Sequence, residues 1–373
     1  MESVSALDFL VKTTNLQEVK VQERTYSEDL LPNQVLLEID QISFSSNNVT
    51  YGVVGDKMGY WSFFPTESGY GIIPAWGFAN VINSNHSDIK VGQRFYGYYP
   101  LSSHLLVSAD KVSDKGFVDN AEHRRALSPI YNYYTNTEND PSINKETENF
   151  ISVFRPLFVT SFLIDDYLAR EDFFKASQIL LTSASSKTAQ ALASLLAHRK
   201  KESGVEIELI ALTSGGNTGF VDDLGWYDKV ISYESLNELD ADKGTIVVDF
   251  AGNHSTQLQL QNLFGDQLVY NCLVGFVDWQ NLDGKDPLPK KGELFFAPTH
   301  AANRQKEWGI AEFQKKVGMA WQQFIGAISS IITMKEYIGA HQLEALYLDV
   351  LNGRIDPKHG NIVRMSGSVK AVS

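Results

Sequence analysis

ILLTSASSKTAQALASLLAH, residues 179–198, is the stretch that decides the fold of this 373-residue chain. An apolar run is followed by a turn of small residues and then by an Ala- and Leu-rich helical pattern, which together are typical of the start of a nucleotide-binding βαβ unit. Glycines usually occupy such a turn because the backbone must approach a pyrophosphate closely at the helix N-terminus. Their places are taken here by Ser183, Ser186, Lys187 and Ala189. The stretch therefore indicates the architecture more strongly than the ligand.

The composition is that of a folded globular protein. Apolar residues make up 43% of the sequence and aromatic residues 12%, and 373 residues suffice for two domains. A net charge of −13 argues against nucleic-acid or anionic membrane partners, and no apolar run reaches the length of a membrane helix. Cys272 is the single cysteine, so neither an internal disulfide nor a cysteine-based zinc site can form. Because the N-terminus also lacks the pattern of a signal peptide, we expect a cytoplasmic protein without bound metal.

The first part of the chain, residues 6–114, predicts short strands. Residues 35–45 alternate in part between apolar and polar side chains, and further strands are expected at 74–82 and on both sides of Pro100. Frequent Gly and Pro residues between these segments favour a small antiparallel barrel. Residues 120–148 are polar, and we expect a surface excursion or a domain boundary there.

The second part predicts a parallel sheet. Residues 154–172 have helical spacing and lead into the first strand at Ile179. Further strands, separated by helical or turn-like segments, are expected at residues 205–214, 229–232, 245–252, 267–275 and 293–298. Strands that alternate with helices at this spacing predict a doubly wound sheet, whose ligands bind beyond the carboxyl ends of the strands.

The order of these elements resembles the medium-chain dehydrogenase/reductase superfamily, most closely its zinc-free quinone oxidoreductase and enoyl reductase branch. The clearest local matches are LFVTSFLIDDYL (157–168), residues 179–197, LGWYDKVISYES (224–235) and LYLDVLNGRIDPKHGNIV (346–363). A second set of segments is also similar to an offshoot of the superfamily with no assigned function: NNVTYG (47–52), YWSFFP (60–65) and SASSKTA (183–189).

The resemblance implies an α/β protein of two domains. The first is a GroES-like antiparallel β-barrel domain, residues 1–150 completed by 336–373. The second is a doubly wound parallel Rossmann domain for the cofactor, residues 151–335. The resemblance also implies a nicotinamide dinucleotide cofactor and a homodimer.

The glycine-free turn can still hold a phosphate. Ser and Thr side chains cap a helix N-terminus, where free N–H groups and the helix dipole favour an anion. Ser185, Ser186 and Thr188 would add hydroxyl donors, and Lys187 would add a positive charge. The alternative is a capped core helix that has lost its nucleotide function.

The end of the second predicted strand bears on the choice of cofactor. NAD-specific enzymes usually carry an acidic residue there for the ribose hydroxyls, whereas this strand ends with Thr213, Ser214 and Asn217. Neutral hydroxyl and amide groups accept a 2′-phosphate without charge repulsion, which favours NADP(H). By resemblance, Tyr233 helps to hold this phosphate. The alternative is a plain turn with Tyr233 packed on the sheet.

Three further residues are candidates for ligand contacts in the second part. Gly252 and Gly275 end the fourth and fifth strands. By resemblance they lie along the nicotinamide side of the cofactor site, where glycine permits a close approach, and ordinary strand-terminating turns are the alternative. Arg304 is either a contact for an anionic substrate or cofactor phosphate, or a surface charge.

Residues 43–65 form the densest polar and aromatic stretch of the first part. By resemblance, this loop carries Asn and Tyr residues that face the nicotinamide, so Asn48 and Tyr51 are the catalytic candidates, with Tyr60 and Trp61 as wall residues. A tyrosine beside a substrate carbonyl can donate a proton or polarise the oxygen, as hydride addition to an enone requires. The alternative is that the aromatic residues form barrel core and the asparagines stabilise turns.

These observations favour an NADPH-dependent, zinc-independent oxidoreductase. It would transfer hydride to an apolar enone, quinone or related small-molecule carbonyl compound. Two alternatives stay open from the sequence. One is a lyase or isomerase that uses the fold without redox chemistry, and the other is a non-catalytic NADP(H)-binding protein.

Overall fold

The computed structural model describes residues 3–275 and 292–365. The chain divides into two compact units, which we call the barrel unit (1–153 with 334–373) and the Rossmann-like unit (154–333). The helix α2 (Glu148–Arg170) begins in the first unit and continues in the second. Over the described ranges, no helix is both long and apolar enough to cross a membrane.

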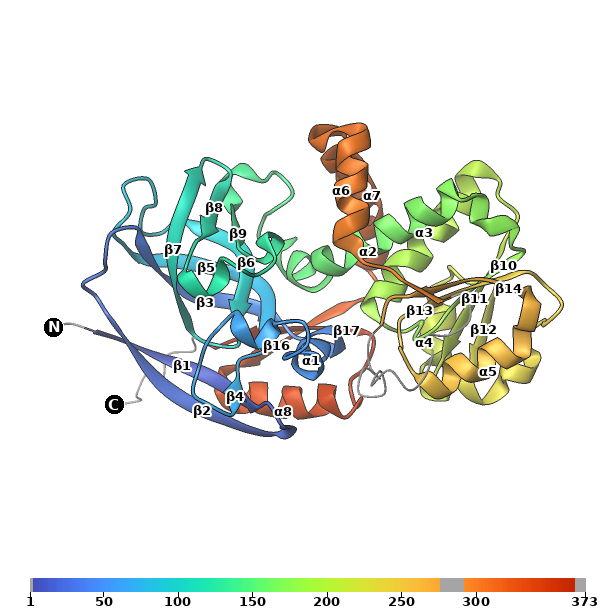
Figure 1. The fold of residues 1–373 in the computed structure, drawn as a ribbon, viewed down its shortest axis with the longest axis horizontal. Helices are drawn as coiled ribbons and strands as arrows, with labels where there is room; N and C mark the ends of the chain where they lie inside the picture. The colour runs from blue at the N-terminus through green and yellow to red at the C-terminus, as the bar shows by residue number, and fades with distance from the viewer. Residues whose placement is uncertain (1–2, 276–291, 366–373) are drawn as a thin grey trace. The chain divides into compact units, whose positions relative to one another are not determined.

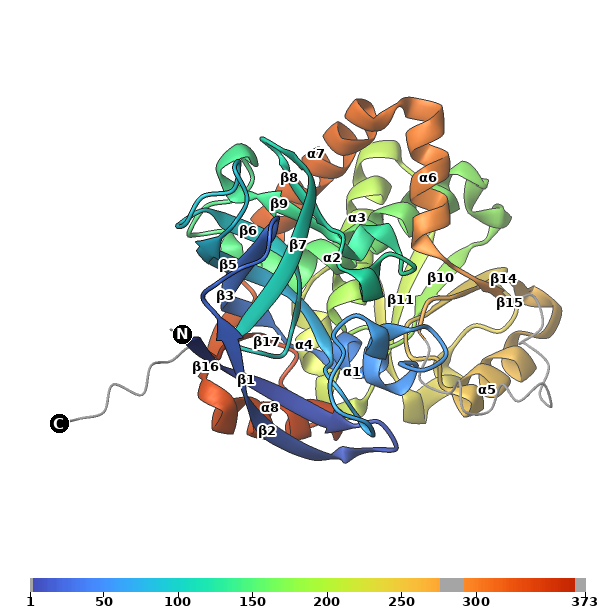
Figure 2. The same ribbon diagram turned by 60° about the vertical axis from the view of Figure 1, so that its left-hand side comes forward.

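The barrel unit contains a closed antiparallel barrel (Figure 2), as predicted. Its strands follow the order β3-β5-β6-β9-β8-β7, and β7 pairs back with β3 to close the ring. Closure removes the free edges of the sheet, so every barrel strand has a neighbour on both sides. The six strands are β3 (Gln34–Ser43), β5 (Pro74–Ser84), β6 (Arg94–Pro100), β7 (His104–Ser113), β8 (Gly116–Asp119) and β9 (Tyr133–Asn136).

The prediction for residues 120–148 was wrong in part, because β9 lies within this polar stretch. Tyr134 and Asn136 are buried in the barrel, whereas Tyr133 is exposed. The strand therefore alternates as a half-buried strand does, but over only four residues. The polar residues that flank it hid this short signal.

Smaller elements complete the barrel unit. A hairpin of β1 (Ser3–Lys12) and β2 (Asn15–Ser27) extends through β4 (Tyr70–Gly71) into a second, three-stranded sheet. Part of the predicted loop at residues 43–65 is helical. The remaining elements are α1 (Ser46–Val53), α8 (Gly339–Leu351), β16 (Thr333–Ile338), β17 (His359–Arg364) and the short 3-10 helices at Tyr60–Ser62, Glu122–Arg124, Pro129–Tyr131 and Thr137–Asn139.

The Rossmann-like unit contains the predicted six-stranded parallel sheet, in the order β12-β11-β10-β13-β14-β15. The chain runs outward in one direction from β10 and then in the other from β13, so the order reverses between these two central strands. A ligand is expected at the carboxyl edge beside this reversal. The strands are β10 (Gln178–Leu181), β11 (Glu208–Thr213), β12 (Lys229–Ser232), β13 (Thr245–Asp249), β14 (Leu268–Leu273) and β15 (Gly292–Leu294).

Helices cover both faces of this sheet, with α3 and α5 on opposite sides (Figure 1). The helix α3 (Lys187–Ser203) buries the Ala and Leu side chains that predicted it, and it ends at Gly204 with a positive φ of 67°. The other helices are α4 (Thr218–Asp223), α5 (His254–Phe264), α6 (Ala297–Trp308), α7 (Ile310–Ile328) and 3-10 helices at Asp172–Lys175, Gly215–Asn217, Tyr233–Glu238 and Gly265–Gln267. The residues predicted as strand up to 298 thus include the start of α6.

Candidate functional site

The turn between β10 and α3 adopts a glycine-like conformation without glycine. Ser183 has a φ of +45°, a region that residues with a Cβ rarely occupy. Its N–H donates to the hydroxyl of Tyr233 at 2.8 Å. The turn then ends at Ser186, whose side chain caps α3 by accepting from the N–H of Ala189 at 3.3 Å. Tyr233 therefore contacts the backbone of the turn, where it supports the strained residue, and burial raises the pKa of its hydroxyl.

Donor groups at the start of α3 remain available. Within the described part of the chain, no acceptor is found for the N–H groups of Ser185 and Thr188. The hydroxyl oxygen of Ser185 accepts from Asn217 Nδ2 at 3.2 Å and from Thr213 Oγ1 at 3.4 Å. Because its oxygen already accepts two hydrogen bonds, the hydroxyl hydrogen of Ser185 is left to donate elsewhere. Three of the predicted cofactor residues, Ser185, Thr213 and Asn217, thus meet at one point.

The remaining predicted residues near this turn are placed differently. The ammonium of Lys187 lies 5.9 Å from the centre of the Phe154 ring, a cation–π contact within the same unit. Ser214 is exposed at the end of β11. The next residue, Gly215, lies close to the carboxylate of Glu234, which the sequence analysis did not include. Glu234 Oε2 would be 3.7 Å from a Cβ built on Gly215. Glu234 follows β12, so the sequence alone did not place it at the end of β11.

A buried carboxylate, Asp249, organises the neighbouring turns. It is 1% exposed, and it accepts from the hydroxyl of Thr182 at 2.5 Å and from the N–H of Gly252 at 3.2 Å. Its backbone oxygen accepts from the N–H of Gly275 at 2.9 Å. Gly252 has a φ of +64°, and a Cβ on Gly275 would lie 2.1 Å from the Phe250 carbonyl oxygen. The backbone conformation therefore requires glycine at both positions. Burial of the Asp249 carboxylate raises its pKa.

These features fit a dinucleotide. Two free N–H groups and one directed hydroxyl, at the N-terminus of a helix, suit the oxygens of a pyrophosphate. The third glycine position is filled by Ala189, which is fully buried and so packs without displacing the helix from the sheet. In this turn, a serine hydroxyl thus adds to the backbone N–H groups as a donor, whereas a glycine-rich turn offers backbone N–H groups alone.

In the barrel unit, Asn48 and Tyr51 lie on α1 but make different contacts. Asn48 Oδ1 accepts from the N–H of Ser45 at 2.8 Å, and its Nδ2 donates to the carbonyl of Pro74 at 3.0 Å. Its hydrogen bonds therefore hold the start of the helix. The hydroxyl of Tyr51 instead accepts from Asn47 Nδ2 at 2.9 Å, and its pKa is raised by burial.

Aromatic rings gather around Tyr51. The ring centres of Tyr51 and Tyr60 are 4.5 Å apart, and the hydroxyl of Tyr60 lies 3.3 Å from that of Tyr131. Trp61 is packed between glycine backbones, since a Cβ on Gly55 or Gly71 would approach its indole to 2.2 Å. The position of the Trp61 indole therefore requires glycine at both places, and its role as a wall residue stays a prediction.

Arg304 is neither free nor at the surface. It is buried on α6, where it faces Asp166 at 3.6 Å and Glu307 at 2.8 Å. The neighbouring carboxylate of Asp165 pairs with Arg199 instead, so the two adjacent aspartates point apart. Among the described residues, no group of three or more His, Cys, Asp or Glu side chains is placed to hold a metal ion.

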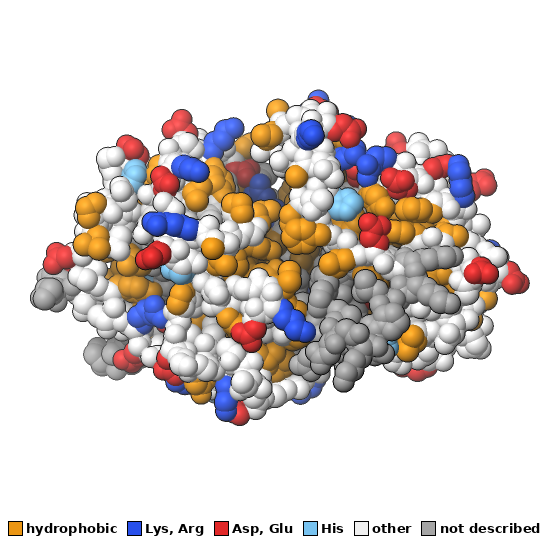
Figure 3. Space-filling model, in the orientation of Figure 1, with side chains coloured by type: hydrophobic (Ala, Val, Ile, Leu, Met, Phe, Trp, Pro, Cys, Tyr) orange, Lys and Arg blue, Asp and Glu red, His pale blue; other side chains and the backbone are white. Residues whose placement is uncertain are grey.

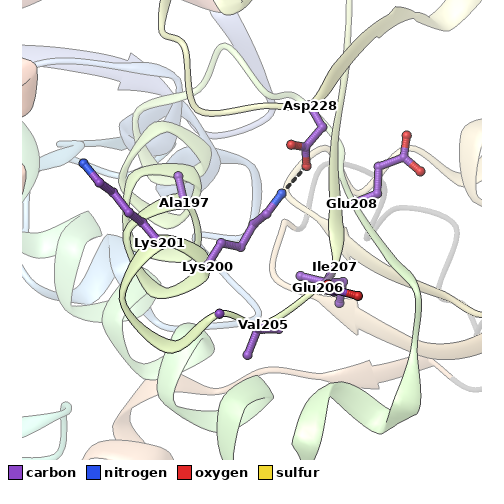
Figure 4. Close-up of a pocket in the computed structure, with 9 residues that line it drawn as sticks. Ala197, Lys200, Lys201, Val205, Glu206, Ile207, Glu208 and Asp228 are labelled. Carbon is purple, nitrogen blue, oxygen red and sulfur yellow. Dashed lines mark hydrogen bonds and ion pairs between the residues drawn. The ribbon is translucent and has the colours of Figure 1, made fainter.

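One face of the surface and one hollow can be compared with this site. Acidic and basic side chains are mixed over the face shown in Figure 3, without a large patch of one sign. A shallow hollow of about 640 Å³ lies between the end of α3 and the start of β11, where Lys200 pairs with Asp228 (Figure 4). This is the amino edge of the sheet, opposite the edge at which doubly wound sheets bind ligands.

Comparison with solved structures establishes the fold. CurA from Vibrio vulnificus in complex with NADPH has a TM-score of 0.61 and 12% identity, covering 97% of this chain and 100% of that one. The yhdH oxidoreductase from Salmonella enterica in complex with NADP has a TM-score of 0.55 and 11% identity, covering 96% and 100%. The CurF ER cyclopropanase of the curacin A biosynthetic pathway has a TM-score of 0.54 and 15% identity, covering 96% and 99%. The predicted fold, an antiparallel barrel together with a doubly wound parallel sheet, is confirmed.

Comparison by sequence places the chain in a family. No curated protein matches it significantly. The model of the family described as "Protein of unknown function (DUF2855)" matches residues 42–356. That range holds the barrel strands from β5 onward, the turn at Ser185 and all of α8, and the chain belongs to this family.

Proposed function

We propose that this protein is an NADP(H)-dependent oxidoreductase that transfers hydride to an apolar enone, quinone or related carbonyl compound. The observation that carries the proposal is the donor set at the turn after β10. There the N–H groups of Ser185 and Thr188 and the directed hydroxyl of Ser185 face no acceptor among the described residues. Further support comes from solved structures of the same fold that contain NADPH or NADP.

The cofactor would be held by the carboxyl edge of the sheet. The pyrophosphate would accept from Ser185 and Thr188, where the dipole of α3 favours an anion. Thr213, Ser214 and Asn217 would lie toward the adenosine ribose and its 2′-phosphate, and Gly252 and Gly275 toward the nicotinamide. When bound, NADPH supplies a hydride with its two electrons and becomes NADP⁺.

Tyr51 is the proposed proton donor. Addition of a hydride to a carbonyl or conjugated enone leaves negative charge on the carbonyl oxygen, which a positioned O–H group stabilises and protonates. Burial raises the pKa of Tyr51, so its hydroxyl stays protonated through neutral pH. Asn48 would act indirectly, by holding the start of the helix that carries Tyr51.

Binding of NADPH, followed by its fluorescence, tests the proposal. The wild type should bind NADPH, and Ser185→Ala should weaken binding by about tenfold, because it removes a hydrogen bond to a charged group. Ser203→Ala is the matched control, since Ser203 lies at the far end of the same helix and donates to the carbonyl of Arg199. Absence of NADPH binding by the wild type would refute the proposal. Binding without NADPH consumption across a panel of carbonyl compounds would instead indicate a non-catalytic or non-redox protein.

Glu234 provides a second test, of the preference for the 2′-phosphate. Its exposed carboxylate lies beside Gly215 and would repel a phosphate there. Glu234→Gln should therefore tighten NADPH binding roughly two- to fivefold, and less so at high salt, while NADH binding stays the same or weakens. Titration of both cofactors at two salt concentrations measures this. Equal effects on the two affinities would show that the 2′-phosphate lies elsewhere.

A further inference from the structure

Two adjacent asparagines on α1 have different hydrogen-bond partners: Asn48 bonds to the backbone, and Asn47 bonds to Tyr51. Asn48 uses its amide for Ser45 and Pro74. Asn47 lies four residues before Tyr51, so the two side chains share a face of the helix, and Nδ2 of Asn47 donates to the Tyr51 hydroxyl at 2.9 Å. The sequence pointed to Asn48, whereas the contact with the phenol belongs to Asn47.

This contact fixes the direction of the Tyr51 hydrogen. A hydroxyl has one hydrogen, and an oxygen that accepts from Asn47 directs that hydrogen away from the amide. In the described chain, no acceptor is found for it. Burial raises the pKa of Tyr51, so the hydroxyl keeps this hydrogen at neutral pH. The Tyr98 hydroxyl is itself buried without a hydrogen-bond partner.

The rings that pack on Tyr51 are uncharged. Tyr60 and Tyr98 pack on Tyr51 with ring centres 4.5 and 5.9 Å away. Arg124, a buried cation of the same aromatic cluster, lies over Phe64 and is paired with Asp119 at 3.3 Å. A carboxylate or phosphate brought to Tyr51 would lose its water without gaining a counter-charge, whereas a neutral carbonyl oxygen would gain a donor.

We infer that Asn47 is a positioning residue that aims the Tyr51 hydroxyl at the carbonyl oxygen of an uncharged substrate. The inference rests on the proposed function, since Tyr51 acts there as the donor to the substrate. It adds to that function the group that orients the proton, and it explains why the substrate should be uncharged.

Infrared spectroscopy of a bound carbonyl compound tests the inference on the full-length protein without NADPH. The probe is carbonyl-labelled acetophenone, and its charged counterpart is 4-acetylbenzoate. Wild type should bind acetophenone at least tenfold more tightly than 4-acetylbenzoate, with the C=O band shifted to lower wavenumber by the Tyr51 hydrogen bond. Tyr51→Phe should abolish this shift.

Two substitutions of Asn47 separate orientation from simple support. Asn47→Ala should leave a reduced shift, because the hydroxyl becomes free to rotate. Asn47→Asp should abolish it, because a carboxylate accepts the phenol hydrogen and turns it away from the probe. The control Asn139→Ala, in which an exposed asparagine loses its bond to the carbonyl of Asp114, should behave as wild type. Thermal unfolding of each variant shows whether the fold is retained.

The outcomes distinguish this inference from the proposed function. A wild-type shift in Asn47→Asp, or equal affinities for the two probes, would overturn the inference. So would failure of the wild type to bind acetophenone. If the shift behaves as expected but NADPH does not bind, the carbonyl site stands and the oxidoreductase function falls.

Discussion

Replacing Tyr51 with Phe is expected to lower kcat for NADPH-dependent carbonyl reduction by about 10²- to 10⁴-fold, the usual contribution of a positioned general acid. The ring contacts with Tyr60 and Tyr98 do not need the hydroxyl, so the fold and NADPH affinity should change little. The lost hydrogen bond to Asn47 is a single contact at a part-buried position. Steady-state kinetics with a reducible carbonyl compound measure kcat and KM separately.

The control is Tyr70→Phe, which removes a phenol from the same unit but leaves the ring that Lys20 covers at 4.2 Å. Since burial raises the pKa of Tyr51, the proton donor should remain intact up to at least about pH 10, the ordinary tyrosine value, and should not cause a loss of kcat below it. A Tyr51→Phe enzyme with wild-type kcat would remove Tyr51 from the mechanism.

The Rossmann-like unit could be predicted from sequence because its central strands are buried. Such a strand is a short apolar run, as in residues 179–181 of β10. The predicted strand at residues 229–232 coincides with β12, which is only partly buried. The barrel gave a weaker signal, since β9 has four residues within a polar stretch. The helix α6 was missed, and its first residues, from Ala297, were assigned to the last predicted strand at 293–298.

The candidate site could be predicted as a region but not as a set of contacts. The sequence indicated Ser185, Thr213 and Asn217, which the structure joins by hydrogen bonds. It could not show that Thr182 reaches Asp249, a residue 67 positions later on another strand. Nor could it choose between Asn47 and Asn48, because the choice depends on which face of α1 each occupies.

Arg124 and Arg125 are another pair of adjacent residues, in the barrel unit, whose different environments only the structure shows. Arg125 is exposed, whereas Arg124 is 0% exposed and donates to Asn132 Oδ1 at 2.9 Å and to the Tyr134 hydroxyl at 2.9 Å. It also pairs with the buried carboxylate of Asp119 at 3.3 Å. Its guanidinium further covers Phe63 and Phe64, which belong to the aromatic cluster around Tyr51.

Arg124→Met is therefore expected to destabilise the barrel unit by about 3–5 kcal/mol, because it leaves the carboxylate of Asp119 buried without a counter-charge. Urea unfolding followed by near-ultraviolet circular dichroism of the tyrosines measures the loss. Arg125→Met should change stability little, since its bonds to Asn120 are exposed. Adding Asp119→Asn to Arg124→Met should recover part of the loss, because the uncompensated charge is then gone. The single variant Asp119→Asn completes the comparison. If the loss of stability in the double variant equals the sum of the losses in Arg124→Met and Asp119→Asn, the ion pair does not account for the effect. Arg124 then acts through its hydrogen bonds and ring contacts instead.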